Sequence, residues 1–93
     1  MRNYFQASVG VTAQRVIEGN RRRTAIGIAN LSGTATIYIG ADNQLTVNNG
    51  FPVYPGTQIT FNKGFGDRPD IERWIVSDSP GADVRIIEEY GDD

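Results

Sequence analysis

The sequence AIGIANLSGTATIYIGADNQLTVNNGFPVYPG, residues 25–56, decides the fold class of this chain. Within it, β-branched and aromatic residues form short segments, and Gly, Asn, Asp or Pro interrupts them roughly every ten residues. Residues that tolerate a positive φ or that begin a turn therefore stand wherever the chain has to reverse. This pattern predicts an antiparallel all-β domain with tight connections.

The same pattern continues on both sides of this stretch and predicts about eight short strands. Apolar residues alternate with small or polar residues in most of the segments, as in a sheet with one buried face. Eight short strands with regular turns are typical of a small antiparallel β-sandwich, jelly-roll-like, or of a partly open barrel. We expect the strands at residues 5–11, 13–17, 24–30, 34–39, 51–54, 58–61, 71–76 and 84–88.

The chain has 93 residues, which is the length of one small domain. We predict a single β-domain over residues 1–93, with an N-terminal arm at residues 1–4 and an acidic C-terminal tail at residues 89–93. The sequence shows no secretory signal and no apolar stretch long enough for a membrane span, so we expect a soluble protein made in a cytosol. Because there is no cysteine to form a disulfide, we expect partner subunits to contribute to stability.

The composition restricts the chemistry that is open to this chain. Neither histidine nor cysteine is present, so the commonest general base and the thiolate ligand are both missing. Asp67, Asp70 and Glu72 lie close together in an expected loop beside arginines, where carboxylates are normally solvated surface charges. No serine stands in a Gly-x-Ser-x-Gly motif. We therefore expect a protein that is not an enzyme and that carries no cofactor.

Metal and nucleic-acid binding are also weakly supported by the sequence. The segment GADNQ at residues 40–44 offers oxygen ligands, but one carboxylate in a turn falls short of a calcium site, and Asp and Asn in turns usually bond to their own backbone. Nine basic and eleven acidic residues give a net charge of −2. This balance argues against broad binding to nucleic acid or to an anionic membrane.

Several aromatic and charged residues are not needed to explain the fold, and we predict that they form a protein–protein interface. The basic run Arg21 to Arg23 is complementary to the acidic end of the chain, so we expect pairing across a subunit boundary. Aromatic residues near the termini suit anchors for a neighbouring molecule, whereas Trp74 is expected in the core. The predicted interface residues are Arg2, Tyr4, Phe5, Arg21, Arg22, Arg23, Tyr90, Asp92 and Asp93.

The stretch NRRRTAIGIAN at residues 20–30 resembles a strand of small virion proteins of tailed bacteriophages, in which arginine precedes alternating aliphatic residues and an asparagine. As in those proteins, TIYIG follows at residues 36–40, LTV at 45–47, NG at 49–50, Pro52, and YPG at 54–56. The segment ADVRIIEE at residues 82–89 is similar to their closing strand. The resemblance covers about residues 9–89 and consists of strand and turn motifs.

The resemblance implies a compact β-sandwich that acts as a capsid cement or decoration protein and bridges capsid subunits on the outer surface of a phage head. It implies a homo-oligomer, with a trimer expected, that binds the major capsid protein or other virion proteins and is made in the cytoplasm of the host bacterium. The alternative is a tail or fibre component, such as a module that binds a host receptor or glycan.

Overall fold

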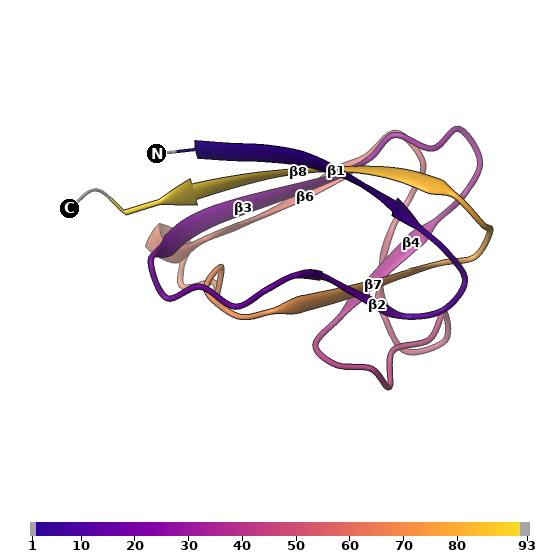
Figure 1. Cartoon of the computed structure of the whole chain (residues 1–93), viewed down its shortest axis with the longest axis horizontal. Helices are drawn as coiled ribbons and strands as arrows, with labels where there is room; N and C mark the ends of the chain where they lie inside the picture. Colours follow the sequence, from indigo (N-terminus) through magenta and orange to yellow (C-terminus); the bar gives the residue numbers. More distant parts are fainter. Residues whose placement is uncertain (1, 92–93) are drawn as a thin grey trace.

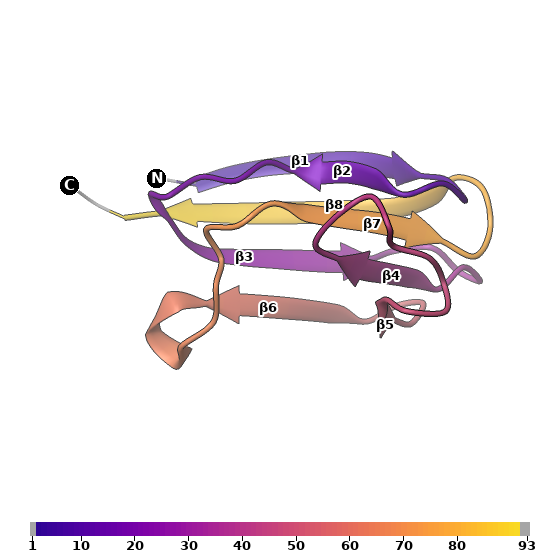
Figure 2. The same cartoon turned by 90° about the horizontal axis from the view of Figure 1, so that it is seen from below.

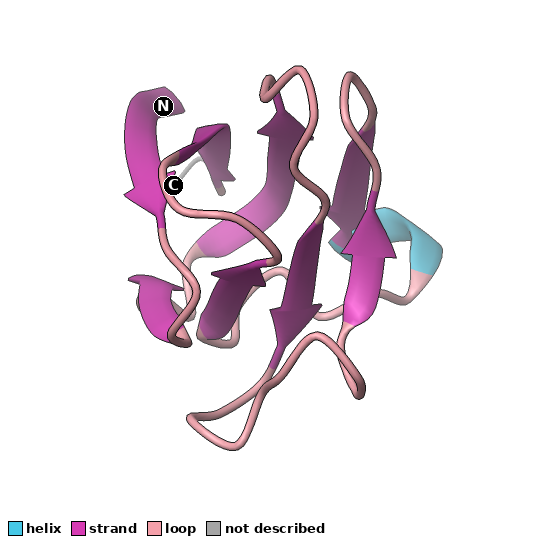
Figure 3. Cartoon of the chain, turned by 90° about the vertical axis from the view of Figure 1, so that its right-hand side faces the viewer, coloured by secondary structure: helices cyan, strands magenta, loops and turns pink. Residues whose placement is uncertain are grey.

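The computed structural model describes residues 2–91, which form eight strands in two four-stranded antiparallel sheets (Figure 1). Each predicted strand has a counterpart, so the all-β prediction is confirmed. Figure 3 shows the strands in two layers, with the short 3₁₀ turn η1 (Lys63–Phe65) at one side. The strands are β1 (Arg2–Val9), β2 (Gln14–Ile17), β3 (Arg23–Asn30), β4 (Ile37–Gly40), β5 (Phe51–Val53), β6 (Gln58–Asn62), β7 (Arg73–Ser77) and β8 (Ala82–Tyr90).

The strand order identifies the sandwich as a jelly roll. One sheet has the order β1-β8-β3-β6 and the other has the order β2-β7-β4-β5. The first strand therefore pairs with the eighth, the second with the seventh, the third with the sixth and the fourth with the fifth. Such nested pairing is what a long hairpin gives when it is wound over itself into two layers. Of the two architectures left open by the sequence, the sandwich is the one observed.

The core lies between the two sheets and consists almost entirely of aliphatic side chains. Ile26 and Ile28 of β3 and Val84 of β8 point into it from one sheet, and Ile37 and Ile75 from the other. These positions follow the alternation of the sequence, because successive side chains of a strand point to opposite faces. β-Branched residues fill this flat layer well.

Asn30 is a polar exception at the end of β3, where the chain leaves one sheet for the other. Its side chain is buried, and Nδ2 donates to the carbonyl oxygens of Ala35 at 2.8 Å and Val53 at 2.9 Å. Its Oδ1 accepts from the Ser32 backbone N–H at 3.0 Å. A buried amide has to be satisfied in this way. Asn30 therefore fixes the β3–β4 connection against β5.

The β4–β5 connection, residues 41–50, folds back over the outer face of its own sheet. Leu45 is the buried residue of this loop, 6% exposed, and it lies directly against Gly40 and Gly50. A Cβ at either glycine would stand within 2.7 Å of the Leu45 Cδ1 atom. Glycine is required at both positions because Leu45 occupies the space of a side chain.

Three expectations need correction. Residues 2–4 of the expected arm belong to β1 and residues 89 and 90 of the expected tail belong to β8, where Arg2 is paired with Glu89 and Tyr90 with Arg23. Asp92 and Asp93 lie outside the described residues. Trp74 is half-buried outside the core, since its neighbour Ile75 takes the inward position of β7.

Candidate protein–protein interface

Arg23, the last residue of the basic run, lies inside the protein. It is 2% exposed, and its Nη2 forms an ion pair with Glu88 Oε2 at 2.7 Å. The pairing of β3 with β8 shifts register between Arg23 and Ala25, and such a bulge alters the alternation of side chains. Glu88 follows Val84 and Ile86 on the inner face of β8. For Arg23, the predicted pairing with the acidic end of the chain therefore occurs within one molecule and not between subunits.

The ion pair joins several segments of the chain at one end of the sandwich. Arg23 donates from Nη1 to the Pro69 carbonyl at 2.9 Å and from Nη2 to the Glu18 carbonyl at 2.7 Å. Glu88 Oε1 accepts from Asn3 Nδ2 at 2.9 Å. Buried charges are stable when they are paired and hydrogen-bonded in this way. Arg23 is thus a residue of the folding core, and its guanidinium is not available to a partner.

Tyr90 belongs to the same network. Its hydroxyl lies 3.1 Å from Glu88 Oε1, to which it donates. Burial raises the pKa of the Tyr90 phenol, and the hydrogen bond to the Glu88 carboxylate raises it further. Tyr90 therefore has a structural role, because its hydroxyl is hydrogen-bonded to Glu88. Its role in an interface stays a prediction.

Arg21 and Arg22 remain exposed in the turn between β2 and β3, at the end of the molecule where β1 begins and β8 ends (Figure 1). Asn20 holds this turn: its Oδ1 accepts from the Arg22 N–H at 3.0 Å and its carbonyl from the Arg23 N–H at 3.0 Å. The Arg22 carbonyl accepts from the Gly91 N–H at 2.8 Å. The turn is therefore a fixed platform that presents two cationic side chains.

The aromatic residues predicted near the N-terminus point to opposite sides of β1. Tyr4 is 65% exposed on the outer face, whereas Phe5 is partly buried against the core. Of the predicted anchors, Tyr4 is the one fully presented to solvent. Arg2 lies in β1, at the register position of Glu89.

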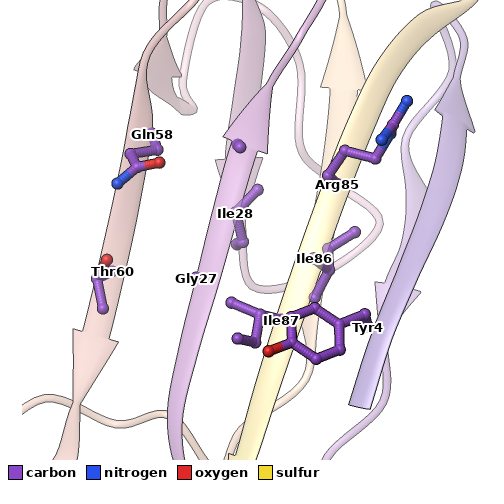
Figure 4. A pocket seen from close by; sticks show the side chains of 9 residues that line it. Tyr4, Gly27, Ile28, Gln58, Thr60, Arg85, Ile86 and Ile87 are labelled. Carbon is purple, nitrogen blue, oxygen red and sulfur yellow. The ribbon is translucent and has the colours of Figure 1, made fainter. Parts of the chain in front are cut away.

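Beside Tyr4, the outer face of the β1-β8-β3-β6 sheet carries a shallow groove of about 260 Å³ (Figure 4). Tyr4, Ile87, Gly27 and Thr60 are register neighbours across the four strands. Gly27 forms the floor, because a residue without a side chain leaves β3 lower than its neighbours. The lining consists of Tyr4, Gly27, Ile28, Ala29, Gln58, Thr60, Arg85, Ile86 and Ile87. We did not predict this groove from the sequence, although the small residues at every second position of β3, Ala25, Gly27 and Ala29, indicate it.

Other large apolar side chains are exposed outside this sheet face. Phe65 on the η1 turn is 84% exposed. Val11 and Val47 line a second open groove, between the β1–β2 and β4–β5 connections, together with the buried Leu45 and Val76. Leu31, Phe51 and Tyr54 are also at least half exposed. We did not include these residues in the predicted interface. The sequence does not show whether the side chain of an apolar residue beside a turn faces the core or the solvent.

The loop carboxylates are engaged in local contacts. Asp42 Oδ1 accepts from the Gln44 N–H at 3.0 Å, as expected for a turn residue. Asp70 pairs with Arg68 at 3.0 Å, and the hydrogen bond from that guanidinium lowers the pKa of Asp70. Glu72 Oε2 accepts from Trp74 Nε1 at 3.0 Å.

The described residues hold neither a cluster of metal ligands nor a helix that could cross a membrane. Within residues 2–91, no three potential metal-ligating side chains come together as a metal site would require. The described chain also contains no helix with the length and apolar character of a membrane crossing.

Comparison with known proteins gives a likeness in structure and none in sequence. No family model matches the chain, and no curated protein matches it. Among solved structures, a chain of the Bacillus endospore appendages, described as a novel family of disulfide-linked pili, is similar with a TM-score of 0.50. It is 14% identical, and the match covers 99% of this chain and 87% of that chain. At this identity the likeness concerns the fold alone.

Proposed function

We propose that this protein is a non-enzymatic structural protein of a tailed-phage virion, a cement or decoration protein that bridges capsid subunits on the outer surface of the head. The observation that carries the proposal is the placement of large apolar side chains on the outside of a rigid frame. Tyr4 is exposed beside the groove of Figure 4, and Val11 and Val47 are exposed together along the second groove. Exposed apolar groups that gather in patches mark sites of protein association. The phage assignment itself comes from the resemblance of the strand and turn motifs.

In this role the protein acts by binding and not by chemistry. Each copy contacts neighbouring capsid subunits, and its binding shifts the shell towards the bound, expanded state by mass action. Such a bridge requires a domain that keeps its contact residues at a constant spacing. The buried Arg23–Glu88 pair and the Asn30 hydrogen bonds hold the two ends of the sandwich, so the exposed Arg21, Arg22 and Tyr4 keep fixed positions. The resemblance further implies copies in groups of three on the shell.

A second candidate is a tail or fibre component that binds a host glycan or receptor. The groove of Figure 4 favours it, because the exposed ring of Tyr4 lines this groove together with the polar side chains of Gln58, Thr60 and Arg85. An aromatic face with nearby hydrogen-bonding groups suits a sugar ring. The similar pilus protein is described as disulfide-linked, whereas this chain has no cysteine with which to form such links.

The two candidates are separated by adding the labelled protein to phage particles that lack it and locating the label by electron microscopy. We expect label over the whole head surface. The variant Arg21→Glu/Arg22→Glu should occupy fewer sites, and the loss should be smaller at high salt because exposed charges are screened over about 10 Å at 0.1 M. Label confined to the tail would favour the second candidate. Particles without label would contradict both.

A further inference from the structure

The described chain has four edge strands, β1 and β6 in one sheet and β2 and β5 in the other. Figure 2 shows β1 and β2 at one side of the sandwich and β5 and β6 at the other. An edge strand leaves backbone N–H and C=O groups unpaired, and proteins normally protect it with proline, charge, a bulge or a covering loop. The four edges differ in this protection.

Both edges of the β2-β7-β4-β5 sheet are protected. The Asp78 N–H donates to the Thr36 carbonyl at 3.1 Å. By alternation, the backbones of Thr36 and Tyr38 therefore face β7, and those of Ile37 and Ile39 face β5. Consequently Pro52, opposite Tyr38, is the outward residue of β5, and it has no N–H to offer. Strand β2 has four residues with a register shift and carries the exposed charge of Arg15.

Strand β6 is partly covered by its own following turn. The outward N–H of Asn62 donates to Asp67 Oδ2 at 2.9 Å, and the Asn62 carbonyl accepts from the Asp67 N–H at 3.3 Å. Gln58 and Thr60 have the same orientation by alternation, so two residues of this edge remain open.

The orientation of β1 follows from its neighbour β8. The Leu31 N–H donates to the Asp83 carbonyl at 2.9 Å, so the Asp83 backbone faces β3 and the Val84 backbone faces β1. Ala7 is the register partner of Val84, so its backbone bonds to β8. The residues of even number therefore face outward. Gly10, the next even residue after the strand, confirms this alternation because its carbonyl accepts from the Ser77 N–H of the other sheet.

Tyr4, Gln6 and Ser8 consequently present their N–H and C=O groups at the free edge. Within residues 2–91, no hydrogen bond engages these outward backbone groups. The segment NYFQASV, residues 3–9, contains neither a charged residue nor a proline. Strand β1 has eight residues, Arg2–Val9, and after Arg2 at its beginning the edge carries neither a charge nor a proline.

We infer that the free edge of β1 is a self-association surface, at which two copies of this chain pair antiparallel about a two-fold axis. With Gln6 opposite Gln6 of the second copy, Tyr4 stands opposite Ser8, and all three outward residues form ladder hydrogen bonds. The absence of charge from residues 3–9 keeps like charges apart. Phe5 and Ala7, partly buried against the core, stand opposite each other and extend the apolar layer across the axis. A two-fold contact is self-complementary and closed.

This pairing does not depend on the proposed virion function, and it can be measured on the isolated protein. It predicts dimers, whereas the phage resemblance implies trimers. The two-fold contact joins the β1-β8-β3-β6 sheets of both copies into one continuous sheet. It also leaves the groove of Figure 4 and the exposed Arg21 and Arg22 accessible on each copy.

Sedimentation velocity of the full chain over a range of concentrations tests the inference. We expect a reversible monomer–dimer equilibrium. Gln6→Pro removes the central outward N–H from both copies and leaves the β1–β8 ladder intact. The dissociation constant of the dimer should therefore rise by about tenfold or more. The matched control Thr60→Pro removes an outward N–H from the β6 edge and should leave the equilibrium unchanged.

Gln6→Lys keeps the inference testable if the proline variant folds poorly. Two lysines at the two-fold axis repel each other, so the dimer should weaken at low salt and recover as salt is added, which a folding defect would not do. A wild-type chain that stays monomeric, a trimer in place of a dimer, or equal weakening by Thr60→Pro would each overturn the inference. Equal weakening would indicate head-to-tail pairing of β1 with β6.

Discussion

The change Glu88→Ala should be among the most destabilising single substitutions in this protein. It leaves the Arg23 guanidinium, 2% exposed, without its counter-charge. Removing one partner of a buried ion pair costs about 3–5 kcal/mol, because the remaining charge is desolvated and unpaired. With a urea m-value of about 2 kcal/mol/M, the unfolding midpoint should fall by roughly 1.5–2.5 M.

Urea unfolding followed by circular dichroism measures this loss, and the surface pair Arg85–Asp83 provides a matched control. That pair has a similar separation of 3.0 Å, but its side chains are 54% and 36% exposed. Arg85→Ala should therefore cost about 1 kcal/mol or less. The double change Arg23→Met/Glu88→Leu should restore most of the stability lost in Glu88→Ala. If Glu88→Ala and Arg85→Ala lower the midpoint equally, the ion pair does not hold this end of the sandwich.

Three further outcomes follow from the packing and the titration of single residues. Gly50→Ala should cost about 1–3 kcal/mol of unfolding free energy, because its Cβ would stand 2.6 Å from Leu45 Cδ1 and 2.7 Å from Tyr38 Cβ. Gly33→Ala should be neutral within about 0.5 kcal/mol, since its Cβ would meet no described atom within 4 Å, and chemical denaturation of both variants checks this. Asn30→Ala should cost at least about 2 kcal/mol by the same assay, because two buried carbonyls lose their donor. The raised pKa of Tyr90 means that the folded state holds the phenol proton more tightly than the unfolded chain does. The stability that the phenol contributes is therefore fully present below its ordinary pKa of about 10, and it is lost as the pH rises through the raised pKa. Thermal unfolding above pH 10 should therefore fall less steeply with pH in Tyr90→Phe than in the wild type, and equal slopes would contradict the role of the phenol.

The strands were predictable because their alternation is local. Val9 is buried, and counting back by two along β1 places Phe5 inward and Tyr4 outward. The parity of the sequence could thus have separated the two aromatic residues that we predicted together as anchors. The fold class was predictable for the same reason, because strand-forming and turn-forming residue types occupy separate, alternating segments of the chain.

The burial of Arg23 was not predictable from the sequence. The bulge between Arg23 and Ala25 depends on how β8 pairs with β3, and this pairing joins residues more than sixty positions apart in the chain. An arginine beside two other arginines therefore suggests a surface run. The groove over Gly27 is similarly non-local, because its walls come from β6 and β8.

The copy number of this protein in purified virions tests the proposed function most directly. Gel densitometry against the major capsid protein measures it. A cement protein on the head surface should give a molar amount comparable to that of the major capsid protein. An amount limited to a few copies per particle would place the protein in the tail, and its absence from purified particles would contradict a virion role altogether.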